Sequence, residues 1–462
     1  MRIVLTNSGT FGDINPLVGL AVELRARGHQ PVLAVPEMFR SSIEPLGLGF
    51  HPVRPDQDPT DSRMAEMIYD IKRGTERGLR EFLFPAIRQS YEDLLEAVTA
   101  CGGADLLLTG ELAYAGPVVA EVTAVPWASY VLAPFSFFSG YDPPVLPPYP
   151  LLARLQEHIP GTGHLVARFA RRVTRDWPEP VYALRRQLGL GPGRSPIFDA
   201  KHSPRLVLAM FPGVLGSPQP DWPANTQVTG FVNYDGRAAA GAAQCADAPG
   251  GAGLSAVVEE FLAAGPPPLV FALGSAAVLN AGDFYEQSAR AALALNQRAI
   301  LLVGSDRRNI PARIDSAAVL ALGYAPYSKL FARASLLVHQ GGVGATAQVL
   351  SAGKPMLVVP YSHDQPDNAR RVRRLGVGRV LTRRHYNEVS AAAQIGALLA
   401  DTACRQRAER VGELVRQEDG ARRACDALEQ LGSAAGTHAL AHPPFTQPDL
   451  DELRPPALDA RR

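Results

Sequence analysis

The chain has 462 residues, more than one compact core usually holds, so two or more domains are expected. Hydrophobic residues make up 46% and charged residues 20%, which is typical of a globular protein and excludes a disordered one. Lysine and arginine number 46 against 45 acids, so net charge provides no attraction to nucleic acid. No stretch reaches the roughly 18 apolar residues of a membrane-spanning helix, and the first residues lack the apolar core of a secretory signal. We therefore expect a cytoplasmic protein with no nucleic-acid partner.

The first half of the chain alternates short apolar runs with helical patterns. An apolar run at 3–5 is followed by a helical pattern that ends at Gly28 and by a second apolar run at 31–35. This order predicts neighbouring parallel strands joined by a helix. Further strand candidates lie at 105–109, 127–131 and 205–209. Residues 1–235 are therefore predicted to form a Rossmann-like domain, a doubly wound parallel sheet with helices on both faces.

A change of composition divides the chain. Pro, Gly and Ala dominate from about 212 to 255, which is typical of a linker or a surface loop. The alternation of strand and helix patterns then resumes, with strand candidates at 269–273, 299–303, 336–338 and 356–359. We predict a linker at 236–255, a second Rossmann-like domain at 256–432 and a disordered tail at 433–462. The two α/β domains are expected to face each other across a cleft.

The strongest motif, LVHQGGVGATAQ, occupies residues 337–348. Glycines let the backbone approach a ligand closely, and the free N–H groups of a helix N-terminus bind anions. A strand ending at His339, a glycine-rich turn and a helix beginning near Ala345 therefore suit a diphosphate, to which His339 could donate a hydrogen bond. The alternative is a tight turn capped by a histidine, because such turns are common.

A second polar group follows the next strand candidate, which ends at Pro360. There His363, Asp364 and Gln365 stand where ligands bind in open α/β sheets, beyond the carboxyl end of a strand. A carboxylate and an amide side by side can hydrogen-bond adjacent sugar hydroxyls. The pair comes one strand–helix unit after a phosphate-type turn, so it predicts a sugar site beside the diphosphate.

An ordered set of motifs resembles the UDP-glycosyltransferase superfamily, which includes antibiotic, sterol and plant secondary-metabolite glycosyltransferases. The motifs are Gly12-Asp-Ile-Asn-Pro16, Tyr324-Ala-Pro326, His339-Gln-Gly-Gly-Val-Gly344 and His363-Asp-Gln-Pro-Asp-Asn368. The likeness runs from Met1 to about Gly432, and within the superfamily the rhamnosyltransferases of rhamnolipid synthesis look closest. The resemblance implies a GT-B fold and an inverting, metal-independent transfer of a hexose or deoxyhexose from a UDP- or dTDP-sugar, with no cofactor.

The resemblance implies donor-binding roles for nine residues of the second domain. They are, in chain order, Ser275, Tyr324, Ala325, His339, Gly342, Gly344, Thr346, Asp364 and Gln365. Ser275 and the residues of the 339–346 turn would contact the diphosphate. Asp364 and Gln365 would hold the donor sugar. The backbone around Tyr324 and Ala325 would meet the pyrimidine, with the Tyr324 ring as a stacking partner.

The first domain contributes a candidate catalytic base, Asp13, where many relatives carry a histidine. It would take the proton of the acceptor hydroxyl during attack. An aspartate near its reference pKa of ~3.9 is a weak base, so the transfer must be concerted with attack, or desolvation must raise the pKa. The alternative is that Asp13 only caps a helix beginning near Pro16.

A further departure from the family pattern concerns the nucleotide. Plant-type relatives hold both ribose hydroxyls with a glutamate on the helix after the phosphate histidine. This chain has Ala347 at that position, followed by Gln348. Without a clamp for the ribose diol, a thymidine diphosphate sugar fits as well as a uridine diphosphate sugar.

The acceptor side carries weaker signals. An aromatic and proline-rich stretch at 127–149 fits the lining of a pocket for an apolar, hydroxyl-bearing acceptor, or a buried strand followed by a rigid loop. A helical pattern further along has apolar residues beside a basic face made of Arg168, Arg171, Arg172 and Arg175. It fits either peripheral contact with an anionic membrane or a solvated helix face.

Two other functions fit parts of the pattern. A non-catalytic nucleotide-sugar-binding partner of another transferase would be free to lose Asp13, which this chain retains. A nucleotide-sugar epimerase would need further acid–base groups at the sugar, where only His363 and Asp364 stand. We therefore expect an enzyme, a hexosyltransferase acting on an apolar small-molecule or lipid acceptor.

Overall fold

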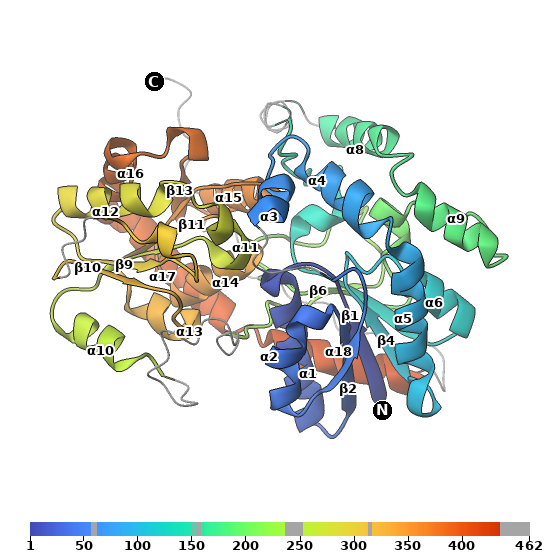
Figure 1. The fold of residues 1–462 in the computed structure, drawn as a ribbon. Helices are drawn as coiled ribbons and strands as arrows, with labels where there is room; N and C mark the ends of the chain where they lie inside the picture. Colours follow the sequence, from blue (N-terminus) through green and yellow to red (C-terminus); the bar gives the residue numbers. More distant parts are fainter. Residues whose placement is uncertain are drawn as a thin grey trace. The chain divides into compact units, whose positions relative to one another are not determined.

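The computed structural model describes residues 1–56, 62–149, 152, 159, 161–235, 253–312 and 317–434. The described residues divide into two compact units, one made of Met1–Tyr234 with Glu418–Ala434, the other of Asp235–Gln417. Each unit is built on one parallel sheet (Figure 1), so the predicted pair of α/β domains is confirmed. Most of the predicted linker, 236–252, and most of the predicted tail, from 435, lie outside the described residues.

The first unit contains a seven-stranded sheet with the order β3-β2-β1-β4-β5-β6-β7. Its strands are β1 (Arg2–Thr6), β2 (Gln30–Val35), β3 (Gly49–Pro52), β4 (Leu106–Thr109), β5 (Trp127–Val131), β6 (Val207–Ala209) and β7 (Thr226–Val228). Leu5 of β1 lies beside Leu33 of β2 and Leu108 of β4, and none of the three is exposed. Such fully buried strands are typical of a parallel sheet covered by helices on both faces.

Helices of the first unit are α1 (Phe11–Ala26), α2 (Arg40–Ile43), α3 (Ser62–Ile68), α4 (Gly74–Arg77), α5 (Ile87–Thr99), α6 (Gly116–Thr123), α8 (Thr162–Val173), α9 (Glu179–Gln187) and α18 (Gly420–Ala434). The chain moves outward from β1 to β2 through α1, and it returns from β3 to β4 through α5. Right-handed crossovers in opposite directions place α1 and α5 on opposite faces of the sheet.

The C-terminal helix α18 packs on α1 and belongs to the first unit. Arg27 Nη1 donates to Asp426 Oδ1 at 2.6 Å, and His29 Nε2 lies 2.9 Å from Glu429 Oε1. The predicted boundary, which kept residues up to 432 in the second domain, is therefore wrong for α18. The amphipathic pattern of a helix shows that it packs, but not which sheet it packs on.

The second unit contains a six-stranded sheet with the order β10-β9-β8-β11-β12-β13. Its strands are β8 (Leu269–Ala272), β9 (Ala299–Leu302), β10 (Val319–Leu322), β11 (Leu336–His339), β12 (Met356–Val358) and β13 (Gly378–Val380). Its helices are α10 (Ala256–Ala263), α11 (Gly274–Ala277), α12 (Phe284–Ala294), α13 (Tyr327–Leu330), α14 (Val343–Ala352), α15 (Gln365–Arg374), α16 (Glu388–Ala400) and α17 (Thr402–Arg416). None of the helices in the described ranges is long and apolar enough to cross a bilayer.

Glu418 lies at the point where the chain returns to the first unit. Its Oε1 accepts a hydrogen bond from Gly213 N at 2.8 Å, and its Oε2 is buried with no partner among the described residues. Gly230, at a φ of +97°, leaves room for this side chain, since a Cβ there would lie 2.9 Å from Oε2. Burial raises the pKa of Glu418 to about 7, and the Gly213 hydrogen bond opposes that increase.

We expect Glu418 to make the stability of the protein depend on pH. The pKa rises from 4.5 for a free carboxyl to about 7 in the native state, so between these values the native state holds more protons and stability falls as pH rises. Glu418→Gln keeps an acceptor for Gly213 and cannot ionise. From about pH 5 to about pH 8, the unfolding free energy of wild type should fall by about 1–3 kcal/mol relative to the variant, measured with urea.

The control for this measurement is Glu413→Gln, a change at an exposed glutamate of α17. Its unfolding free energy should follow that of wild type at both pH values. A constant difference between wild type and Glu418→Gln at the two pH values would contradict the assignment.

Candidate functional site

In the first unit the strand order reverses between β1 and β4. The segments that leave the carboxyl ends of two such strands diverge, and ligands bind in the crevice between them. Here the two segments are tied together, because Asn7 Oδ1 accepts a hydrogen bond from Leu112 N at 3.2 Å. Gly110 makes this approach possible, since a Cβ there would lie 2.2 Å from the Asn7 side chain.

Asp13 lies on this edge, in the first turn of α1, which begins at Phe11 and not near Pro16 as predicted. Thr10 donates to Asp13 Oδ2 from its backbone nitrogen at 2.7 Å and from its hydroxyl at 3.0 Å, a capping-box arrangement. Gly9, at a φ of +118°, leaves the space, since a Cβ there would lie 2.4 Å from Oδ2. Asp13 therefore does cap α1, but both bonds use Oδ2, so Oδ1 can accept a proton from a ligand.

The electrostatics of Asp13 favour proton uptake. Burial raises the pKa of Asp13 to about 6; the backbone hydrogen bond from Thr10 opposes the increase, and the Glu111 carboxylate adds to it. Desolvation therefore raises the pKa of Asp13, as its role as a base would require. A base whose pKa lies closer to neutral pH is a better proton acceptor at that pH.

Sequence analysis missed a buried group beside Asp13, centred on Glu111. Glu111 Oε2 accepts a hydrogen bond from the Ser136 hydroxyl and lies 3.6 Å from Lys201 Nζ. Lys201 is 7% exposed; burial lowers its pKa, and Glu111 opposes that decrease. The pair places a carboxylate and a buried cation close to Asp13. The one sequence signal was that Glu111 follows the strand candidate at 105–109 by two residues.

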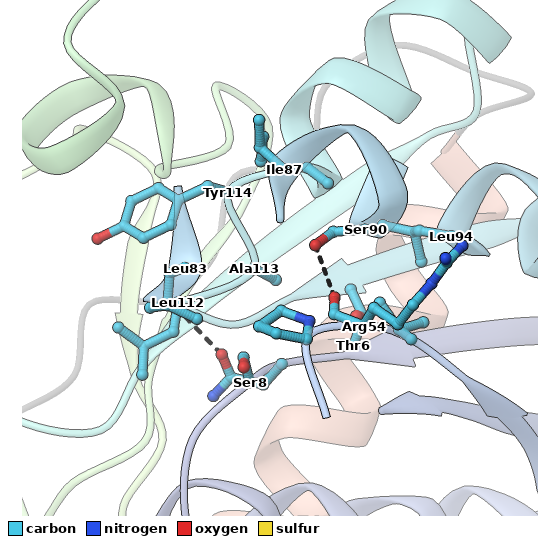
Figure 2. A pocket seen from close by; sticks show the side chains of 14 residues that line it. Thr6, Ser8, Arg54, Leu83, Ile87, Ser90, Leu94, Leu112, Ala113 and Tyr114 are labelled. Carbon is cyan, nitrogen blue, oxygen red and sulfur yellow. Dashed lines mark hydrogen bonds between the residues drawn. The ribbon is translucent and has the colours of Figure 1, made fainter. Parts of the chain in front are cut away.

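A pocket opens at the same edge of the first sheet (Figure 2). Polar residues that follow β1 and β3 form one part of the lining, and apolar side chains around α5 and after β4 form the rest. The lining residues are Thr6, Asn7, Ser8, Val53, Arg54, Pro55, Leu83, Ile87, Ser90, Leu94, Leu112, Ala113, Tyr114 and Ala115. Ser8 Oγ is buried without a partner among the described residues, as is Thr109 Oγ1 at the end of β4. Unpaired buried hydroxyls of this kind are suited to bind a polar group of a ligand.

The aromatic stretch at 127–149 does not line this pocket. Phe137 is 8% exposed and stacks on Trp222, with ring centroids 4.0 Å apart. Phe138 packs edge-on against Phe198 at 4.8 Å. These contacts favour the alternative of a buried structural segment over that of an acceptor-pocket lining.

In the second unit the strand order reverses between β8 and β11. All nine predicted donor-binding residues lie at or just beyond the carboxyl ends of β8, β10, β11 and β12: Ser275, Tyr324, Ala325, His339, Gly342, Gly344, Thr346, Asp364 and Gln365. The sheet therefore brings residues that are up to ninety positions apart in the chain to one edge, from Ser275 to Gln365. Gly342 is the N-cap of α14 and leaves the helix N-terminus without a side-chain cap, which suits an anion.

His339 is 1% exposed and both of its ring nitrogens have neighbours inside the protein. Nδ1 accepts a hydrogen bond from Gly341 N at 3.1 Å, and Nε2 lies 3.3 Å from Met356 Sδ. Burial lowers the pKa of His339 to about 3, so the ring is neutral and carries its proton on Nε2. In this conformation His339 shapes the turn, and its contact with a diphosphate remains a prediction that requires the ring to rotate.

Gln340, which sequence analysis passed over, lies between the glycine turns that follow β8 and β11. A Cβ on Gly274 would be 2.4 Å from Gln340 Nε2, and a Cβ on Gly342 would be 2.9 Å from it. The side chain is 7% exposed, and its Oε1 has no partner among the described residues. The amide nitrogen, which lies against both turns, is the group placed to donate to an anion there. The one sequence signal was its place next to His339.

The two hydroxyl residues predicted to contact the diphosphate, one after β11 and one after β8, differ in exposure. Thr346 is fully buried, and its hydroxyl donates to Gly342 O at 3.0 Å, so it stabilises α14 and does not face the turn. Ser275 is exposed in the first turn of α11. Contact with a phosphate therefore remains a prediction for both, and the geometry favours Ser275.

The turn after β12 is joined to the β11 turn by Asn368. Its Nδ2 donates to Gly341 O at 2.9 Å and to Asp364 Oδ2 at 2.7 Å. Gln365 Oε1 accepts hydrogen bonds from Tyr361 N at 2.9 Å and Ser362 N at 3.2 Å. Gln365 therefore holds its own loop with its oxygen, and only its amide nitrogen is left for a sugar hydroxyl.

Tyr324 and Ala325 lie beyond the end of β10. The Tyr324 hydroxyl donates to Asp235 O, and Ala325 is 3% exposed. The half-buried Tyr324 ring is thus held at one end. In the described part of the chain, no cluster of three His, Cys, Asp or Glu side chains is arranged to hold a metal ion.

Comparison with known proteins agrees with this architecture. Residues 3–136 match the family model described as glycosyltransferase family 28 N-terminal domain, and 289–422 match the erythromycin biosynthesis protein CIII-like C-terminal domain. O-mycaminosyltylonolide 6-deoxyallosyltransferase of Streptomyces fradiae is 32% identical over 454 residues, covering 96% of this chain and all of the relative.

Solved structures are similar over nearly the whole chain. Spinosyn forosaminyltransferase matches with a TM-score of 0.66 and 19% identity, covering 94% of this chain and 99% of the other. Spinosyn rhamnosyltransferase, in complex with thymidine diphosphate, matches with a TM-score of 0.64 and 18% identity, covering 93% and 100%. The fold is that of GT-B enzymes. With a relative 32% identical along its full length, the chain belongs to the glycosyltransferases, in the family of the antibiotic-biosynthesis enzymes.

Proposed function

We propose that this glycosyltransferase moves a hexose or deoxyhexose from a dTDP- or UDP-sugar to a hydroxyl of an apolar acceptor, with inversion and without a metal ion. One observation carries the proposal. Asp13, whose pKa is raised to about 6, lies at the strand reversal of the first sheet, where a pocket is lined by Ser8 with its unpaired hydroxyl. A diphosphate-type turn lies at the corresponding reversal of the second sheet.

In the proposed reaction the acceptor oxygen attacks the anomeric carbon on the face opposite the leaving diphosphate. The bond between the anomeric carbon and the phosphate oxygen breaks, and the hydroxyl proton passes to Asp13 Oδ1. The leaving group gains negative charge, which the N–H groups at the start of α14 and the Gln340 amide stabilise. Neutral donors placed in advance can do this without a cation.

For the nucleotide we favour thymidine diphosphate. Ala347, which replaces the glutamate of plant-type relatives, is 1% exposed, and Gln348 beside it is half-buried. Neither offers a carboxylate to a ribose diol, so a 2′-hydroxyl has no charged partner at this position. The structurally similar spinosyn rhamnosyltransferase, which contains thymidine diphosphate, supports this choice.

For the acceptor we favour an apolar molecule bound in the pocket of Figure 2, with a polar group directed at Ser8. The name of the Streptomyces fradiae relative combines a deoxyhexosyl group with an already glycosylated acceptor, which supports a deoxyhexose donor here. The likeness to rhamnolipid rhamnosyltransferases remains a prediction. Peripheral membrane contact, suggested by the arginine-rich pattern, concerns the separate surface of α8.

The choice of nucleotide is tested by thermal unfolding of the protein with dTDP, UDP, dTDP-glucose and UDP-glucose. A ligand at about 100 times its dissociation constant stabilises the fold by ~2.7 kcal/mol. The dTDP compounds should raise the melting temperature at least as much as the UDP compounds, with GDP-mannose as the non-pyrimidine control. A strong preference for UDP compounds would reject the argument from Ala347.

Catalysis and donor binding should be separable in two variants. Asp13→Asn keeps an acceptor for Thr10 and should bind donor normally while losing about 10²–10⁴-fold in turnover. Gln340→Ala should weaken donor binding by about tenfold, the value of one hydrogen bond to an anion. Exposed Asp176→Asn and Gln417→Ala are the matched controls, and both should behave like wild type.

These variants also test the alternative function, a non-catalytic nucleotide-sugar-binding partner. In that case wild type would bind donor without turning it over, and Asp13→Asn would change nothing. Turnover that survives Asp13→Asn would instead leave the enzyme assignment intact and reject Asp13 as the base.

The charge of Glu111 should set the pH dependence of turnover. The rate falls as pH drops through the pKa of Asp13 at about 6, because protonated Asp13 cannot accept a proton. Glu111→Gln removes a negative charge that raises this pKa, so the acidic limb of kcat/KM should move to lower pH. The loss near neutral pH should stay below about tenfold, far smaller than for Asp13→Asn.

Glu121→Gln is the control for that experiment. Glu121 is an exposed carboxylate of the same unit, 2.7 Å from Arg185. Its replacement should leave the acidic limb in place. An acidic limb that does not move in Glu111→Gln would show that Glu111 does not act on the base.

A further inference from the structure

Helix α8 lies at the edge of the first unit (Figure 1) and uses one side for packing. Gly163, Val166 and Ala170 form its buried side. Gly163 packs closely, since a Cβ there would lie 2.2 Å from Gly140 O. The other side of the helix is not covered by any described part of the chain, as the exposures of its side chains show.

The uncovered side carries a row of large apolar side chains. Leu165, Phe169 and Val173 are four residues apart and are 62%, 46% and 48% exposed. Tyr149 extends the row, with its ring 6.0 Å from that of Phe169. Of the twelve exposed large hydrophobic side chains in the described ranges, six lie between 141 and 173: Tyr141, Tyr149, Ile159, Leu165, Phe169 and Val173. Apolar exposure is therefore concentrated here, which is typical of an interaction surface.

A row of cations runs beside the apolar row. Arg168 and Arg172 are one turn apart and exposed, and Arg175 follows the end of the helix. None of the three forms an ion pair with a described residue, whereas Arg171 on another side is paired with Asp199 at 2.6 Å. The helix contains no acidic residue. Its positive charge is therefore neutralised only in part within the first unit.

We propose that this α8 face, made of Leu165, Arg168, Phe169, Arg172 and Val173, docks on an anionic lipid bilayer. Arginines beside an exposed row of leucine, phenylalanine and valine are typical of helices that lie in the membrane interface. Their alkyl stems lie along the apolar boundary while the guanidinium groups reach the anionic headgroups.

A bilayer fits this surface better than a protein partner does. Arginine is common in protein interfaces, but three arginines without partners would need acids in matching positions on a protein partner. An anionic membrane has negative charge over its whole plane, so the arginines need no partner in a fixed position. The proposal does not depend on the proposed reaction, since the surface lies outside the Asp13 site and its pocket.

The test is sedimentation of the full-length protein with vesicles of phosphatidylcholine alone and of phosphatidylcholine mixed with phosphatidylglycerol. Wild type should bind the anionic vesicles and not the neutral ones, and added salt should weaken binding. Arg168→Gln with Arg172→Gln should reduce the partition coefficient by about thirtyfold, from about 1 kcal/mol for each arginine. Leu165→Ser with Phe169→Ser should reduce it at low and at high salt.

Arg205→Gln with Arg410→Gln is the charge-matched control, since both arginines are exposed and lie outside α8. It should bind vesicles as wild type does, and all variants should unfold at the wild-type temperature. Absence of binding by wild type, equal binding to both vesicle types, or equal losses in the control and in the α8 variant would overturn the proposal. Self-association that only the α8 variants abolish would overturn it as well, in favour of a second copy of the chain as the occupant.

Discussion

The candidate sites on the two sheets depend on one constraint, the right-handed connection of parallel strands. A right-handed crossover places the helix on a face that is set by the direction in which the chain moves along the sheet. Each sheet here is extended in both directions from a central pair, β1 with β4 and β8 with β11. The segments that leave those strands must diverge to opposite faces, so each sheet has an edge where backbone N–H groups and side chains are not covered by the next helix. Asp13 and Gln340 both lie on such edges.

At the first edge, the carboxylate that takes part in helix capping is also the proposed proton acceptor. The two hydrogen bonds from Thr10 hold Oδ2 of Asp13 and lower its pKa, while burial and Glu111 raise it. The effects that raise the pKa are larger than those that lower it, and the two hydrogen bonds from Thr10 fix the orientation of the carboxylate. This arrangement requires glycine at position 9, since any Cβ there would collide with the carboxylate. Capping and catalysis, which compete as interpretations of the sequence, are compatible in the structure.

Sequence analysis predicted two parallel sheets, the glycine turns and the edge on which nine donor-binding candidates lie, because hydrophobic alternation and glycine turns are local patterns. It missed the strands β3, β7, β10 and β13. It did not predict how side chains within the turns are oriented. His339 points inward to Met356 and Gln340 lies over Gly274, and both orientations depend on neighbours that are distant in sequence. The Glu111–Lys201 pair and the docking of α18 depend on contacts over 90 and about 400 residues, which no local pattern records. Candidate site residues located by a backbone turn were therefore predictable from the sequence. Those located by a long-range side-chain contact were not.

The two edges also differ in how they handle charge. The first keeps two carboxylates close together, one of them paired with buried Lys201, and burial together with the other carboxylate raises the pKa of Asp13 to about 6. The second offers neutral donors to the proposed diphosphate, the helix start at Gly342 and the Gln340 amide, and its histidine is neutral. Donors placed in advance stabilise the negative charge that would develop on a departing diphosphate. The proposed metal-independent reaction is consistent with this division, a candidate base on one sheet and neutral hydrogen-bond donors on the other.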